Sequence, residues 1–188
     1  FIVMPDHRGF PSNGQKNWDS AFLPARHQGT LICPGAANPI EDLFPSLNGI
    51  VTKASESDGL EVMNRLNRRH AETRPGDSRL EARIKSYELA ARMQLSATDA
   101  LDITGESEDT RRLYGLDKDT TRAYGKRCLM ARRLMERGVR FVQLFHEAWD
   151  QHGNLTKAVK QNCVDTDQAS AALVTDLKER GLLDDTIV

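Results

Sequence analysis

Apolar residues along the chain occur in two patterns, as short continuous runs and as longer stretches with helical spacing. These runs lie at residues 1–4, 30–32, 141–145 and 186–188, and the third is nearly continuous, with Phe141, Val142, Leu144 and Phe145. Short runs rich in Val, Ile and Phe are typical of strands buried in a sheet that helices cover. The pattern therefore predicts an α/β fold with a mostly parallel sheet.

Helical spacing marks the stretches between these runs. It predicts helices that begin near residue 55 and near residue 77, and further helices over 107–114, 119–137 and 155–180. Pro75 and Gly76 separate the first two, while Gly138 and Gly181 end the last two. Asn154 is expected to cap the final helix. The segment from about 55 to 137 is thus predicted to be mainly helical.

Residues 141–145 are predicted to form the central strand of the sheet, because they lie between two long helices. Helices 119–137 and 155–180 would cover its two faces, which gives a three-layer α/β/α sandwich. Four side chains of the last helix would then face the sheet: Ala169, Ala172, Leu173 and Leu177. The run 186–188 is expected to be a further parallel strand that completes a βαβ unit.

The first and the last residues of the chain lie in apolar or β-branched runs that are typical of strands. A domain rarely starts or stops inside a core strand, because the backbone groups of that strand need partners. We therefore expect residues 1–188 to be a single partial α/β domain, an incomplete fragment of a longer chain.

Helix 119–137 is rich in cations and has one acid, Glu136, in its last turns. The cations are Arg122, Lys126, Arg127, Arg132, Arg133 and Arg137. A basic helix can attract anions. The alternative is a solvated surface, which we favour because these residues circle several faces of the helix.

Composition excludes several classes of function. The net charge of −1 gives no overall field toward nucleic acid or an anionic membrane. No run of about 18 apolar residues could span a bilayer. The three cysteines are odd in number and widely spaced, which argues against a disulfide framework or a zinc finger. Cys128 is predicted to be a small buried hydrophobe. The oligomeric state does not follow from the sequence.

Polar residues follow two of the predicted strands, where α/β folds bind ligands. Asp6, His7 and Arg8 come after the first strand and suit an anion or metal site, or else a solvated loop. His146 and Glu147 follow residues 141–145. Because neighbours in a strand point to opposite faces, at most one of these two should face a shared cleft.

Asp150 and His152 form a mixed carboxylate and imidazole pair. Such a pair suits zinc, manganese or iron, if the backbone bends enough to bring both groups to one ion. A catalytic zinc needs about three protein ligands, so the pair alone is not a site. The alternative is that Asp150 caps the next helix while His152 is exposed.

Several segments resemble one bacterial family. They are LPARHQGT (23–30), RPGDSRLEARIKSYELAARMQ (74–94), ESEDTRRLYGLD (106–117), CLMARRLMERGVRFVQL (128–144), WDQH (149–152) and DLKERGLLDDTIV (176–188). The family is the sulfatase-like domain of unknown function 1501, placed within the alkaline-phosphatase superfamily. The segments that resemble it follow one another in order along almost the whole chain.

The resemblance implies an alkaline-phosphatase or sulfatase-like fold and metal-dependent hydrolysis of a small anionic ester. WDQH is similar to the family's Trp-Asp-x-His motif, so Asp150 and His152 are implied as ligands of a divalent metal such as zinc or manganese. The residues around the metal or in a substrate loop would be Asp6, His7, Arg8, His146 and Glu147.

Other consequences of the resemblance concern the protein as a whole. It assigns no nucleophile or other catalytic residue within residues 1–188, and it implies export to the periplasm. The isolated chain is predicted to lack substantial esterase activity and to bind metal weakly or not at all. The alternative is a non-catalytic binding or structural protein that retains the fold.

Overall fold

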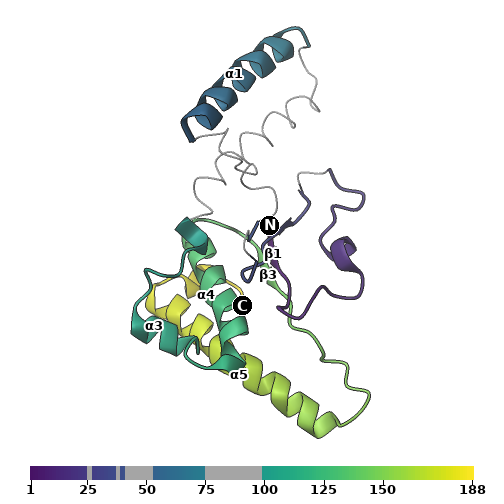
Figure 1. Ribbon diagram of the computed structural model, residues 1–188, viewed down its shortest axis with the longest axis vertical. Helices are drawn as coiled ribbons and strands as arrows, with labels where there is room; N and C mark the ends of the chain where they lie inside the picture. Colours follow the sequence, from purple (N-terminus) through teal and green to yellow (C-terminus); the bar gives the residue numbers. More distant parts are fainter. Residues whose placement is uncertain (25–26, 37–38, 41–52, 75–98) are drawn as a thin grey trace. The chain divides into compact units, whose positions relative to one another are not determined.

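The structure is a computed structural model that describes residues 1–24, 27–36, 39–40, 53–74 and 99–188. It divides into two compact units, one formed by Phe1–Pro39 with Ala100–Val188 and the other by Ile40–Asp99. The second unit contains helix α1 (Lys53–Glu72), as the spacing near residue 55 predicts. The helix predicted to begin near residue 77 lies outside the described residues. The larger unit contains the three described strands and the α-helices within residues 108–179, which Figure 1 shows together.

The larger unit is built on a small parallel sheet with the strand order β2–β1–β3. These strands are β1 (Ile2–Met4), β2 (Thr30–Leu31) and β3 (Val142–Leu144). The α/β class is therefore confirmed. The prediction that 141–145 is the central strand is wrong, because β1 occupies the centre and β3 lies at the edge of this sheet.

Burial explains why β1, and not β3, is the central strand. All three residues of β1 are buried, and Val3 and Met4 are 0% exposed. The residues of β3 are only half-buried, Gln143 interrupts their apolar run, and Phe141 before them is 59% exposed. An unbroken apolar run suits the position with a neighbour on each side. A parallel sheet of three short strands does not confirm the alkaline-phosphatase or sulfatase-like three-layer fold, which stays a prediction.

The unit also contains the helices α3 (Glu108–Leu113), α4 (Asp119–Glu136) and α5 (Leu155–Glu179), of which α4 contacts the sheet through β3. Ser107 caps α3 by accepting a hydrogen bond from the backbone N–H of Thr110 at 3.1 Å. Gly138 and Gly181 follow α4 and α5 with φ of 82° and 69°. This left-handed conformation favours glycine, so the predicted ends of both helices are confirmed.

The core of the unit lies mainly between α4 and α5, which pack against each other (Figure 1). Its buried members are Tyr114, Cys128, Leu129, Ala169, Ala172, Leu173 and Leu177. The sheet adds Leu144 at the margin, and α4 rather than α5 makes the main contact with β3. The prediction that these two helices cover the two faces of this strand is therefore wrong, because they pack against each other and the four predicted residues of α5 belong to the core that it shares with α4. Cys128 is buried, as predicted.

One local prediction is confirmed in part and another is wrong. Asn154 occupies the N-cap position of α5, and its carbonyl accepts a hydrogen bond from the N–H of Ala158 at 3.0 Å, but with a left-handed φ of 50° its side chain makes no cap hydrogen bond. Residues 186–188 do not form a strand in this structure. Instead, a 3-10 turn, η3 (Leu183–Asp185), is followed by Thr186, which donates its hydroxyl to the carbonyl of Leu182 at 2.7 Å. This turn ends the segment with Ile187 fully exposed.

The basic helix is not simply a solvated surface. Arg127 and Arg132 are each 2% exposed. Arg132 pairs with Glu106 at 2.7 Å, Glu136 at 2.8 Å and Asp176 at 3.1 Å, and so joins α4 to α5. The solvated interpretation is therefore wrong for these two arginines, because buried carboxylates and carbonyls compensate their charges.

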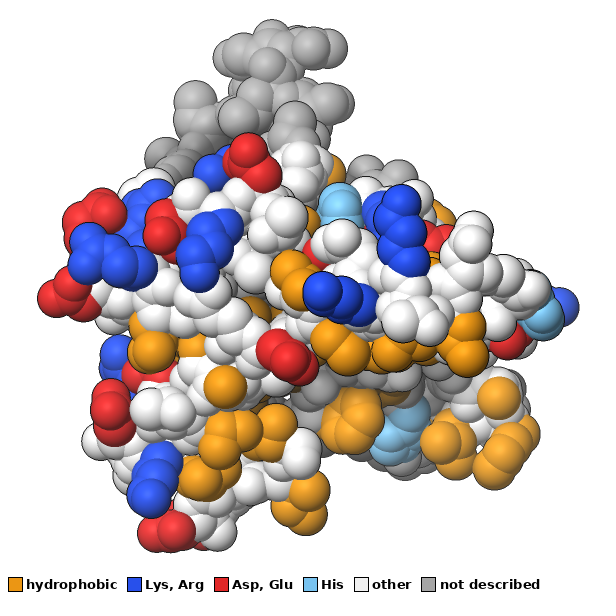
Figure 2. Space-filling model, turned by 90° about the horizontal axis from the view of Figure 1, so that it is seen from below, with side chains coloured by type: hydrophobic (Ala, Val, Ile, Leu, Met, Phe, Trp, Pro, Cys, Tyr) orange, Lys and Arg blue, Asp and Glu red, His pale blue; other side chains and the backbone are white. Residues whose placement is uncertain are grey.

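The surface agrees with the small net charge of the sequence. On the face in Figure 2, Lys and Arg side chains lie interspersed with Asp and Glu. Within the part of the chain that the structure describes, no helix combines the length and apolarity needed to cross a bilayer.

Candidate functional site

The candidate site begins where β1 ends, in a tight turn that carries Asp6. Asp6 and Gly9 form an isolated antiparallel bridge, and the backbone N–H of Gly9 donates to the carbonyl of Asp6 at 3.2 Å. The turn brings His7 and Arg8 back over the Asp6 carboxylate, which is buried. This buried carboxylate needs several donors, because an unpaired buried charge is costly.

Asp6 receives hydrogen bonds from two separate segments. Arg8 donates from Nη2 to Oδ2 at 2.9 Å, from Nε to Oδ1 at 3.2 Å and from its backbone N–H to Oδ1 at 3.0 Å. The Nδ1 atom of His7 lies 2.8 Å from Oδ1. The backbone N–H of Glu147, beyond β3, donates to Oδ2 at 2.7 Å. Burial alone would raise the pKa of Asp6, but these hydrogen bonds outweigh it and hold the pKa well below its ordinary value.

Arg8 extends the same contacts to the loop after β3. Its Nη2 donates to the carbonyl of Glu147 at 3.1 Å and lies 3.5 Å from Nε2 of His146. Its Nε lies 3.7 Å from the Glu147 carboxylate. Both His146 and Glu147 therefore turn toward Arg8. Alternation along a strand does not apply to them, because β3 ends at Leu144. Neither residue lines the pocket that Asp6 and Arg8 border, so the expectation that at most one of them faces a shared cleft stays a prediction.

The side chain of His146 is 6% exposed and lies between two aromatic rings. Its ring centroid is 5.6 Å from that of Tyr124 and 5.6 Å from that of Trp149. Nε2 lies 3.9 Å from the Asp165 carboxylate, and Nδ1 has no hydrogen-bond partner among the residues described. Burial lowers the pKa of this imidazole, so the neutral form is favoured.

Arg127 ties the ends of β1 and β3 to α4. Its Nη1 donates to the carbonyl of Pro5 at 2.6 Å and to that of Phe145 at 2.7 Å, while Nε donates to Ala123 at 3.3 Å. Nη2 is buried and has no partner in the described part of the chain. Burial lowers the pKa of Arg127, and the nearby Asp6 opposes that effect only in part.

Sequence reasoning missed Arg127, although a signal was present. Positions 124, 127, 128, 131, 132 and 135 follow the i, i+3, i+4, i+7, i+8, i+11 spacing of one helix face. Arg127 and Arg132 therefore lie on the same stripe as Tyr124 and Cys128. A cation on a buried stripe predicts a specific buried partner.

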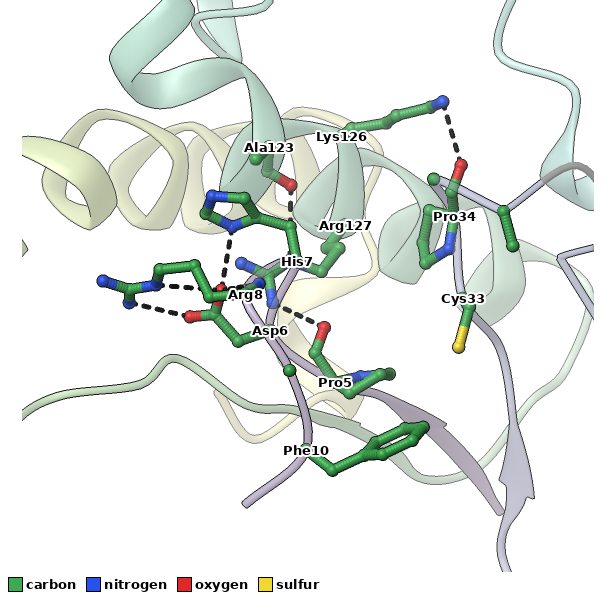
Figure 3. Close-up of a pocket in the computed structure, with 13 residues that line it drawn as sticks. Pro5, Asp6, His7, Arg8, Phe10, Cys33, Pro34, Ala123, Lys126 and Arg127 are labelled. Atoms are coloured by element: carbon green, nitrogen blue, oxygen red, sulfur yellow. Dashed lines mark hydrogen bonds and ion pairs between the residues drawn. The ribbon is translucent and has the colours of Figure 1, made fainter. Parts of the chain in front are cut away.

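A pocket of about 380 Å³ adjoins these residues (Figure 3). Its polar lining consists of Asp6, His7, Arg8, Lys126 and Arg127. Its apolar lining includes Pro5, Phe10, Pro34, Ala36 and Ala123. The lining thus has three cations against one carboxylate, a net charge of +2 with His7 neutral. Lys126 donates from Nζ to the carbonyl of Pro34 at 3.1 Å, which places its ammonium group at the segment after β2.

The side chains of Asp150 and His152 contact each other and do not line the pocket. Oδ2 of Asp150 lies 2.9 Å from Nε2 of His152, and the two side chains are 90% and 85% exposed. The alternative in which Asp150 caps α5 is not seen, since its carboxylate pairs with His152 instead. Within the described ranges no group of three or more metal-ligating side chains occurs. This arrangement offers two donors of mixed type to a metal ion.

The structure therefore brings together five of the predicted site residues and leaves the other pair apart. Asp6, His7, Arg8, His146 and Glu147 share one network of contacts. The pair Asp150 and His152 lies further along the same loop. Pocket residues from α4 and from the segment after β2 complete the site, and these were not predicted.

Comparison with known proteins places the chain in a family. No curated protein and no solved structure matches it. The family model described as "Protein of unknown function (DUF1501)" matches residues 1–188. Because this match extends over the whole chain, the protein belongs to the DUF1501 family.

Proposed function

We propose that the pocket beyond β1 and β2 binds a small anionic ester of the phosphate or sulfate type. The observation that carries this proposal is the buried guanidinium of Arg127, whose Nη2 lacks a hydrogen-bond partner in the described residues while the side chain lines the pocket. A buried cation with an unused donor is stabilised by an anion that supplies acceptor oxygens.

The surrounding charges favour such a ligand. Asp6 is the one carboxylate of the lining, and its two oxygens already accept hydrogen bonds from Arg8 and from the loop after β3. Asp6 neutralises the guanidinium of Arg8 and leaves Lys126 and Arg127 as cations at the pocket. Arginine suits tetrahedral oxyanions because its planar group donates several hydrogen bonds in a fixed geometry.

We further propose that the protein is a metal-dependent ester hydrolase in which Asp150 and His152 supply two metal ligands. Their donor atoms are 2.9 Å apart, so both can lie about 2.0–2.2 Å from one ion. A bound zinc or manganese ion would polarise the ester or activate a water molecule. The resemblance to the alkaline-phosphatase superfamily supports the same chemistry.

This chain's own contribution is to hold the loop that carries the two ligands. Asp6 accepts a hydrogen bond from the backbone of Glu147, and Arg8 donates one to its carbonyl. These contacts hold the start of the loop that leads to Asp150 and His152. A loop that is already held in place loses less conformational entropy when a ligand binds to it.

The alternative function is anion binding without catalysis. This alternative is favoured by the pair Asp150 and His152, because both side chains are exposed and no third metal-ligating side chain joins them within the described residues. The two functions differ in turnover. Release of 4-nitrophenol from 4-nitrophenyl phosphate or sulfate by the full-length gene product, supplied with zinc or manganese and abolished by EDTA, supports the hydrolase. Anion binding by that product without such release supports the alternative.

Anion binding is tested by isothermal titration calorimetry of the chain with inorganic phosphate and sulfate. Lys126→Gln should weaken binding about tenfold, since one hydrogen bond to a charged group contributes about 1.5 kcal/mol or more. Lys178→Gln, at the exposed end of α5, is the matched control and should have no effect. The proposal is wrong if neither anion binds, or if the two variants behave alike.

Metal binding is tested separately, by titration of the metal-free chain with zinc and manganese. The double substitution Asp150→Asn with His152→Gln should abolish any binding seen for the unmodified chain. Binding that survives this double substitution would exclude the pair as metal ligands.

A further inference from the structure

The anion pocket is larger and more apolar than an isolated phosphate or sulfate requires. We propose that its ligand is an aryl ester, whose flat apolar group lies against Phe10 and Pro34 while the anion meets Lys126 and Arg127. This inference rests on the proposed function and names the class of ester that the site accepts.

The volume of the pocket is the first observation. At about 380 Å³ it falls within the range of roughly 300–1,000 Å³ that is usual for organic ligands. A tetrahedral anion alone would leave most of this space to water. The cations lie on α4 and the turn after β1, so the remaining space adjoins the apolar lining (Figure 3).

The second observation is the support behind Phe10. This side chain is 55% exposed, yet its ring lies 5.8 Å from that of Trp18, which is buried. Trp18 in turn contacts the ring of Phe145, at 6.3 Å, at the end of β3. Phe10 therefore presents an exposed aromatic surface that a buried partner holds in place. Aromatic rings pair favourably with one another in tilted or offset arrangements.

The third observation concerns the alcohol from which the ester is formed. Pro5, Phe10, Pro34, Ala36 and Ala123 have side chains without hydrogen-bonding groups. A sugar bound against them would lose hydrogen bonds between its hydroxyls and water without replacement, which is unfavourable. An aryl group loses none and removes apolar surface from water. The apolar part of the lining thus favours an aryl ester over a sugar ester that carries the same anion.

Calorimetric titration of the full chain with phenyl phosphate, inorganic phosphate and glucose 6-phosphate tests the inference. Phenyl phosphate should bind about tenfold more tightly than inorganic phosphate, a difference of about 1.4 kcal/mol. Glucose 6-phosphate should have no such advantage. Phe10→Ala should remove the advantage, so that the variant binds phenyl phosphate no more tightly than inorganic phosphate. Phe22→Ala, which replaces a 94% exposed aromatic of the same loop, should change neither affinity.

The possible outcomes separate this inference from the proposed function. If inorganic phosphate binds but phenyl phosphate binds no more tightly, the aryl preference is wrong and the anion site stands. If none of the three compounds binds, the anion site itself is wrong. If phenyl phosphate keeps its advantage in Phe10→Ala, with tryptophan fluorescence showing that the variant is folded, the assignment of Phe10 is overturned.

Discussion

Replacement of Arg127 by Met should destabilise the larger unit, because Arg127 joins three elements of the fold. Methionine has a similar length but donates no hydrogen bonds. The substitution leaves the carbonyls of Pro5 and Phe145, which Arg127 contacts at 2.6 and 2.7 Å, without this donor. The ends of β1 and β3 would then lose their shared attachment to α4.

The expected magnitude follows from these two short contacts. Each hydrogen bond to a charged group contributes about 1.5–3 kcal/mol, so the pair contributes about 3–6 kcal/mol. Removal of a buried charge returns part of this, since burial disfavours the guanidinium and lowers the pKa of Arg127. We therefore expect a loss of about 2–4 kcal/mol in the free energy of unfolding.

Urea unfolding followed by tryptophan fluorescence measures this loss in the right part of the chain. Both tryptophans, Trp18 and Trp149, belong to the larger unit. With a slope of about 2 kcal/mol per molar urea, the midpoint should fall by about 1–2 M. Arg122→Met is the control, since Arg122 is an exposed arginine of the same helix and should cost less than about 1 kcal/mol. Equal midpoints for the two variants would refute the role assigned to Arg127.

Three further substitutions probe the same unit. Burial alone would raise the pKa of Asp6, but the hydrogen bonds that it accepts hold this pKa below the unfolded value of about 3.9. The free energy of unfolding should therefore fall as the pH drops below about 4. In Asp6→Asn the urea midpoint should depend less on pH in that range. Burial lowers the pKa of His146, so the unfolded chain binds more protons and stability should fall as the pH drops below about 6.5; a His146→Gln variant with an unchanged slope would contradict this. At Gly125 a Cβ atom would overlap the backbone carbonyl of Tyr114. Gly125→Ala should therefore lower stability by about 1–3 kcal/mol in the same urea assay, despite the better helix propensity of Ala.

The sequence by itself determined the helices, their ends and the class of the fold. The helical spacing predicted α1, α3, α4 and α5, and Gly138 and Gly181 marked where two of them end. These features depend on contacts between residues a few positions apart, which a local pattern contains in full. The sequence also identified the segments after β1 and β3 as the polar ends of strands.

Only the tertiary structure decided the order of the strands and the composition of the site. The apolar runs 1–4 and 141–145 both predicted strands, but the place of each in the sheet depends on the strands with which it pairs. The pocket joins Phe10, Pro34 and Arg127, which lie far apart in the sequence. The stripe on α4 could show that Arg127 is buried, but its partners, the carbonyls after β1 and β3, belong to distant segments. A single sequence carries no local signal for contacts between distant segments, because these contacts depend on long-range packing and not on helical or strand periodicity.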